Sequence, residues 1–247
     1  MSARSDTPAR SGTPAVSVSR APFVPALNGF GFDNRWPHVA PLRFRVGGPL
    51  PVELAIGDAA NGLCGGMAFA ALDLWFAGVP MPAPAETPAD GSPAFRYIVR
   101  RQLDSFELGL APARFYLLGA PWRSAASRAA EVIRRELPRI RRELAAGRPV
   151  AMGLVRSVSA NPATLIQDHQ VVACSVDAGP VPGSLALRIY DPNLPGDDTV
   201  RLIVGQDPSG GLSLAYSGGP PVVAFFRQGY RPRDPVPWRP VQASGPA

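Results

Sequence analysis

The sequence predicts an α+β fold in which a buried N-terminal helix packs on a mostly antiparallel β-sheet. Apolar residues with helical spacing occur before residue 147, and short apolar runs separated by Gly, Pro, Asn and Asp follow it. With 247 residues, 46% of them hydrophobic, the chain can bury a core in one large domain or two small ones. Because the helices precede the strands, the order is that of an α+β protein.

Three helices are expected in the first part of the chain. Residues 65–76 are apolar nearly all round, as in a helix buried on most faces. Residues 94–106 form the second helix and residues 125–146 the third, which Pro138 should kink or restart. Glu131 and Arg135 are spaced as an i,i+4 pair. Five arginines between the apolar positions of the third helix should form its solvated face: Arg134, Arg135, Arg139, Arg141 and Arg142.

Six strands are expected after residue 147, and together they predict a mostly antiparallel sheet. Each is a short apolar run bounded by turn-forming residues. Their ranges are 150–155, 170–176, 185–190, 200–204, 212–216 and 222–226.

The chain is expected to form a single domain over residues 23–229, with no repeat and no linker. Residues 1–22 contain no apolar stretch and are expected to be a disordered tail. Residues 230–247 are expected to be a second disordered tail, because closely spaced prolines prevent regular structure. The segment 81–93 should be an exposed loop.

Charge and composition argue against several function classes. The net charge is +6 and every basic residue is arginine, but these residues are scattered rather than grouped with aromatic side chains. We therefore expect no nucleic-acid partner. Neither a secretory signal nor a membrane span is evident, so we expect two free thiols, no membrane partner and a cytoplasmic location. The alternative is export by a route that the N-terminus does not show. No zinc spacing or phosphate loop indicates a cofactor, and Asp197 and Asp198 should lie in a polar loop.

Cys64 is the first candidate for chemistry. Glycines at 62, 65 and 66 allow close backbone approach and leave the sulfur little covered. If the helix begins here, its unpaired N–H groups and dipole stabilise a thiolate. The alternative is a glycine-rich turn with an incidental cysteine. Cys174, inside an apolar strand, should be a buried small hydrophobe.

His169 and the segment after residue 190 supply the other candidates. His169 opens a strand after a predicted loop over 157–168, whereas His38 lies in a proline-flanked loop and is expected to be structural. Asp191 and Asn193 follow a strand, where they either form a simple turn or hold the imidazole by its second nitrogen. Strand alternation favours Asp191 for this task, since Asn193 lies beyond Pro192.

The order Cys, His, then Asp or Asn resembles the papain-like cysteine peptidase superfamily. Within it, a histidine strand followed by a strand ending in Asp-Pro is similar to the bacterial double-glycine leader peptidases. The words GLCGGM, DHQVV and YDPN also resemble an uncharacterised bacterial group of papain-like proteins. The resemblance covers roughly residues 55–200 and its motifs are short.

The resemblance implies a thiol hydrolase that acts on a peptide or protein substrate without a cofactor or metal. Cys64 would be the nucleophile, His169 the general base and acid, and Asp191 the orienting residue, with Asn193 as its rival. The superfamily commonly has an oxyanion-hole glutamine about six residues before the cysteine, but this chain has Asp58 there. Asn61 and the N–H of Cys64 are the remaining donors. An acyltransferase or transglutaminase-like enzyme and an inactive binding module stay open as alternatives.

Overall fold

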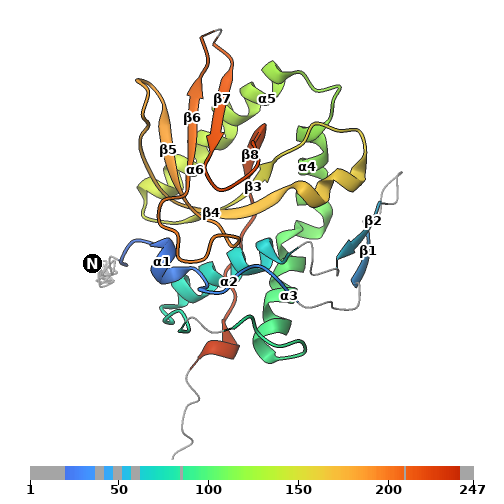
Figure 1. The fold of residues 1–247 in the computed structure, drawn as a ribbon, viewed down its shortest axis with the longest axis vertical. Coiled ribbons are helices and arrows are strands. Elements are labelled where there is room, and N and C mark those ends of the chain that lie inside the picture. Colours follow the sequence, from blue (N-terminus) through green and yellow to red (C-terminus); the bar gives the residue numbers. More distant parts are fainter. Residues whose placement is uncertain are drawn as a thin grey trace, which may run out of the picture.

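The computed structural model describes residues 20–36, 62–83, 86–208 and 210–239, and the backbone alone of residues 42–46 and 52–56. It is an α+β protein in which helices lie against a curled six-stranded antiparallel sheet (Figure 1). The helices are α1 (Pro25–Asn28), α2 (Cys64–Ala77), α3 (Pro93–Ser105), α4 (Leu110–Gly119), α5 (Ala125–Glu131) and α6 (Leu137–Ala145). Shorter helical turns are η2 (Glu107–Gly109), η3 (Val132–Glu136), η4 (Pro162–Gln167) and η5 (Val236–Trp238).

The main sheet contains the six strands predicted after residue 147, all antiparallel, in the order β7-β6-β5-β4-β3-β8. A separate hairpin pairs β1 (Leu42–Val46) with β2 (Val52–Ile56), and the sequence did not predict it. The register between β4 and β5 shifts on either side of Cys174, so this cysteine sits at a β-bulge. The main strands are β3 (Val150–Val155), β4 (His169–Ala178), β5 (Leu185–Tyr190), β6 (Arg201–Gln206), β7 (Leu212–Tyr216) and β8 (Ala224–Arg227).

The centre of the sheet is covered on both faces. Val171, Ala173 and Ile189 join one core cluster with α4, η3 and α6. The intervening residues Val172 and Tyr190 join a second cluster with α2 and α3. Since successive side chains of a strand point to opposite faces, β4 and β5 supply both cores. This double burial fixes the strand ends that carry His169 and Asp191.

Helix α2 is buried over eleven of its fourteen residues, as its apolar sequence predicts. Its glycines permit close packing: a Cβ at Gly65 would lie 1.6 Å from Oε1 of Gln170, and one at Gly66 would lie 2.3 Å from the Ile98 carbonyl oxygen. Strand β4 and helix α3 therefore both press against the first turn of α2. Gly78, at φ 67°, ends the helix in a left-handed conformation.

The predicted third helix is formed by α5, η3 and α6 in direct succession, and its backbone hydrogen bonds change from the α-helical to the π-helical pattern before Pro138. A π-helical turn, η3, separates α5 from α6, and the Leu137 N–H donates to the Val132 carbonyl five residues earlier. Proline lacks an N–H and its ring displaces the carbonyl four residues before it, which explains a local widening here. The five arginines of this segment are exposed and Arg135 pairs with Glu131 at 3.4 Å, so the predicted solvated face is confirmed.

Residues 230–239 differ from the disordered tail that the proline content predicts. The Tyr230 ring stacks on Phe76 with centroids 5.6 Å apart, and its hydroxyl donates to Oδ1 of Asp73 at 2.7 Å. The buried Asp73 carboxylate also pairs with Nε of Arg101 at 2.7 Å and accepts from the Arg233 N–H at 2.8 Å. Prolines exclude regular secondary structure but not aromatic burial, which anchors this segment to α2 and α3.

Several further helical elements were not predicted, among them α1, η2 and η5. Helix α4 occupies residues 110–119, and η4 lies within the segment 157–168 that the sequence predicts to be a loop. The described residues include no helix with the length and apolar content of a membrane span.

Candidate active site

Cys64 occupies the first residue of α2, as the glycine-rich sequence predicts. The residue before it, Leu63, donates its N–H to Oδ1 of Asn34 at 2.7 Å. Gly62 has φ 70°, and a Cβ there would lie 2.4 Å from Nδ2 of Asn34. Glycine is therefore required at 62 both by the left-handed backbone and by the close approach of Asn34. Cys64 itself is half-buried.

His169 begins β4, where its backbone lies opposite Leu154 of β3. Its side chain is buried, and Nε2 lies 2.6 Å from Oδ1 of Asp191. The Cys64 thiol is a close neighbour of the same imidazole, because each group shifts the pKa of the other. Asp191 occupies Nε2, which leaves Nδ1 as the ring nitrogen open to a second partner. The imidazole thus links a thiol on a helix to a carboxylate on the sheet.

Asp191 directly follows β5 and is fully buried. Its Oδ1 also accepts the Asn193 N–H at 2.8 Å, and its Oδ2 accepts the hydroxyl of Tyr216 from β7. Three donors thereby hold a carboxylate that burial alone would disfavour. The pairing of Ala173 with Ile189 puts His169 and Asp191 on the same face of adjacent strands, as the alternation predicts.

The electrostatics of the three groups favour a thiolate–imidazolium pair. Burial raises the pKa of the Cys64 thiol, but the hydrogen bond and positive charge of His169 outweigh it and lower the pKa below its ordinary 9.0. The Gln170 N–H lowers it further by donating to the sulfur. Burial lowers the pKa of His169, yet the Asp191 carboxylate raises it to about 9. Burial raises the pKa of Asp191, and the His169 charge reverses that and lowers it.

Asn193 does not hold the imidazole by its side chain. Its Oδ1 instead accepts from Nδ2 of Asn34 at 2.8 Å, while its backbone N–H holds Asp191. Asn34 therefore connects the turn after β5 to the residue that precedes Cys64. The other residues singled out in the sequence, Asn61, Asp58 and His38, lie outside the described residues.

The first turn of α2 places backbone N–H groups beside Cys64. N–H groups of a first helical turn have no intrahelical carbonyl partner. Oε1 of the buried Gln102 on α3 accepts the Gly66 N–H at 2.8 Å. The N–H of Cys64, at the start of the helix, remains available to a developing negative charge beside the sulfur.

Cys174 lies inside strand β4, as the sequence predicts, but it is half-buried like Cys64 rather than fully buried. Burial raises the pKa of its thiol to about 12, and Sγ contacts the Val172 carbonyl oxygen at 3.5 Å. The surroundings thus lower the pKa of the Cys64 thiol and raise the pKa of the Cys174 thiol.

Sequence reasoning missed Asn34, Gln102 and Tyr216. Asn34 and Gln102 lie in a loop and on α3, where nothing in their local sequence marks a contact with α2. Tyr216 has the strand position that alternation predicts for a side chain on one face with Leu212 and Leu214. Its contact with Asp191 depends on the order of strands in the sheet, which strand patterns do not specify.

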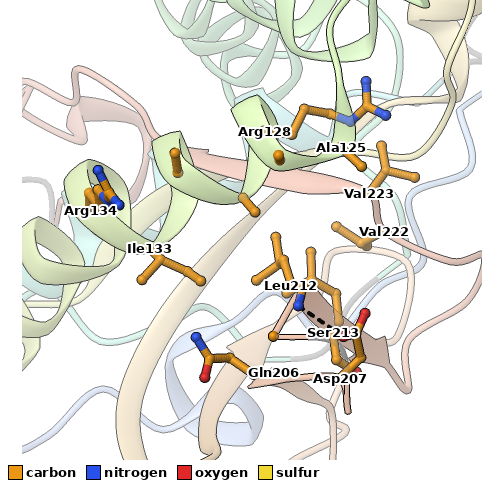
Figure 2. A pocket seen from close by; sticks show the side chains of 16 residues that line it. Ala125, Arg128, Ile133, Arg134, Gln206, Asp207, Leu212, Ser213, Val222 and Val223 are labelled. Atoms are coloured by element: carbon orange, nitrogen blue, oxygen red, sulfur yellow. Dashed lines mark hydrogen bonds between the residues drawn. The ribbon is translucent and has the colours of Figure 1, made fainter.

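A large groove lies elsewhere on the molecule. Figure 2 shows it between α5–η3 and the β6–β7 hairpin, with a volume of about 940 Å³. Small and aliphatic side chains such as Ala125, Ile133, Leu212 and Val222 line it, and none of the three catalytic candidates does. Within the described ranges, no group of three or more His, Cys, Asp or Glu residues is arranged to hold a metal ion.

The chain was compared with models of protein families, with curated proteins and with solved structures, and it matches none of them.

Proposed function

We propose that this chain is a papain-like thiol hydrolase that cleaves a peptide or isopeptide bond. One observation carries the proposal: Nε2 of His169 lies 2.6 Å from the buried Asp191 carboxylate, and the same imidazole lowers the pKa of the half-buried Cys64 thiol. A cysteine nucleophile needs a base within hydrogen-bond reach and a third group that orients the base. All three requirements are met by residues from α2, β4 and the end of β5.

In the proposed reaction the Cys64 thiolate attacks the substrate carbonyl carbon, and a bond forms between sulfur and carbon. The Cys64 N–H at the helix start donates to the oxyanion. The His169 imidazolium then protonates the leaving amine as the carbon–nitrogen bond breaks. Water, deprotonated by His169, attacks the thioester and releases the acid together with the free thiol. Asp191 holds the ring and stabilises its charged form throughout.

The test is hydrolysis of a mixed peptide library by the wild-type chain and by Cys64→Ala, with new amino termini identified by mass spectrometry. Cleavage that depends on Cys64 supports the proposal. Product analysis with an added primary amine identifies acyl transfer instead, because the amine then appears covalently bound to the acyl fragment. If Cys64 fails to react with a thiol-directed activity probe, the protein is a binding module on the same scaffold.

A further inference from the structure

Arg156, immediately after β3, carries a charge that the described residues leave unpaired. Its Nε and Nη2 are buried and donate no hydrogen bond. Within the part of the chain that the structure describes, no carboxylate lies at salt-bridge distance from its guanidinium. Burial of an unpaired guanidinium is costly, and proteins rarely retain such a group without a partner. Arg156 therefore has two buried N–H donors for which the described residues provide no acceptor.

The nearest acidic group compensates this charge only in part. Asp168 accepts the backbone N–H of Arg156 at 2.9 Å, so the contact uses the main chain rather than the guanidinium. Burial raises the pKa of this carboxyl to about 7 despite the nearby Arg156 charge. Asp168 is then only partly ionised near neutral pH, and a net positive charge remains on the Arg156 side chain.

Arg156 lies next to the candidate active site. Its guanidinium carbon is 5.9 Å from the ring centroid of Tyr216, whose hydroxyl donates to Asp191. Burial and the Asp191 carboxylate raise the pKa of that hydroxyl; the Arg156 charge lowers it and the Cys64 charge raises it, so Arg156 and Cys64 each lie within electrostatic range of Tyr216. Arg156 also follows the strand that pairs with the start of β4, where Leu154 is opposite His169.

The connection between β7 and β8 places no side chain of residue 219 against the guanidinium. Gly219, in the connection between β7 and β8, has φ 138° and supplies no side chain there. A Cβ at this position would have Nη2 of Arg156, at 3.8 Å, as its only neighbour within 4 Å.

We propose that Arg156 is an anion-binding subsite beside Cys64 that receives a carboxylate of the substrate. A planar guanidinium matches a carboxylate with two parallel hydrogen bonds, which Nε and Nη2 have free to offer. This inference rests on the proposed function, because it gives the thiol hydrolase a preference for substrates that bear a carboxylate near the scissile bond.

The test compares two small alkylating reagents that differ in charge. Iodoacetate carries a carboxylate and iodoacetamide does not. The measured quantity is the rate of Cys64 labelling by iodoacetate divided by the rate with iodoacetamide. Dividing this ratio by the same ratio for glutathione gives a normalised ratio that reports an anion subsite. We expect Arg156→Gln to reduce this normalised ratio about fivefold, because the substitution removes one positive charge from a partly solvated site. The rate of labelling by iodoacetamide should change much less. Arg156→Lys keeps the charge but not the two parallel hydrogen bonds, so it should retain only part of this ratio. Arg141→Gln, which removes an exposed arginine of α6, should leave it unchanged.

An unchanged ratio in folded Arg156→Gln overturns the subsite and leaves Arg156 as a support for the Tyr216 ring. If Arg156→Gln does not fold, wild-type protein decides the matter. Succinate at constant ionic strength should then slow iodoacetamide labelling of Cys64, and no slowing overturns the proposal. A Cys64 that reacts with iodoacetamide no faster than an ordinary thiol counts against the hydrolase instead. The charge ratio remains measurable in that case, so the two failures are distinguishable.

Discussion

Replacing His169 with alanine should raise the pKa of the Cys64 thiol and slow its alkylation at neutral pH. In the native protein, burial raises this pKa, while the hydrogen bond and charge of His169 lower it below its ordinary 9.0. The substitution removes the lowering influence of the imidazole and keeps most of the burial. The thiol should therefore become less acidic than an exposed cysteine.

Cys174 provides the magnitude, because it is a thiol of the same protein buried without an imidazole partner. Its pKa is raised to about 12. If Cys64 moves from below 9.0 to this value, its thiolate fraction falls at least about 1000-fold, since each pKa unit is a factor of ten. A more basic thiolate is intrinsically more reactive, which with a Brønsted slope of about 0.45 recovers about 20-fold. The alkylation rate should fall about 50-fold.

The assay is the rate of iodoacetamide labelling at Cys64, followed by mass spectrometry from acid to alkaline pH. His38→Ala is the matched control and should leave both the rate and the apparent pKa unchanged. Thermal unfolding of each variant shows whether the fold is intact. A folded His169→Ala variant that labels as fast as the wild type would refute the argument that this imidazole stabilises the thiolate.

Three further predictions concern the same residues. Cys64 should be labelled by iodoacetamide far faster than Cys174 at neutral pH; equal rates at the two cysteines contradict the assignment. Asp191→Asn should slow the labelling of Cys64 more than Asn193→Ala does, because of these two residues only Asp191 carries a negative charge beside the imidazole. If Asn193→Ala slows the labelling more, Asn193 is the orienting residue. In a Cys64→Ser background, Asp191 still raises the pKa of His169 above its ordinary 6.5. The folded protein therefore holds this proton more tightly than the unfolded chain, and the contribution to the free energy of unfolding is greatest below pH 6.5. It should decline towards pH 9 by at most about 3 kcal/mol, and a flat profile in urea denaturation contradicts this.

Local patterns were sufficient to predict the elements that carry the candidate triad. Helix α2 is apolar on nearly every side, so its burial follows from composition alone, and glycines mark its start. Alternation in β4 and β5 predicts that His169 and Asp191 share a face, and in the structure Nε2 of His169 lies 2.6 Å from Oδ1 of Asp191. These predictions depend on neighbouring residues and on one pair of adjacent strands.

Contacts between distant segments were not predictable in this way. Tyr216 is the last residue of β7, two strands away from β5 in the sheet order, and its hydroxyl still reaches Asp191 after β5; this contact depends on sheet topology. Tyr230 packs on α2 through ring stacking and a hydrogen bond to Asp73, although the prolines around it predict disorder. Hydropathy and proline content describe local backbone preferences, whereas these contacts depend on tertiary packing.

The central claim is that Cys64 exists as a thiolate paired with the His169 imidazolium. The most direct measurement is a pH titration of thiolate ultraviolet absorbance, taken as the difference between wild type and Cys64→Ser. The account predicts a step equivalent to one thiolate with an apparent pKa below 9.0. A step at or above 9.0 would contradict it, because burial would then outweigh the imidazolium and Cys64 would be an ordinary buried thiol.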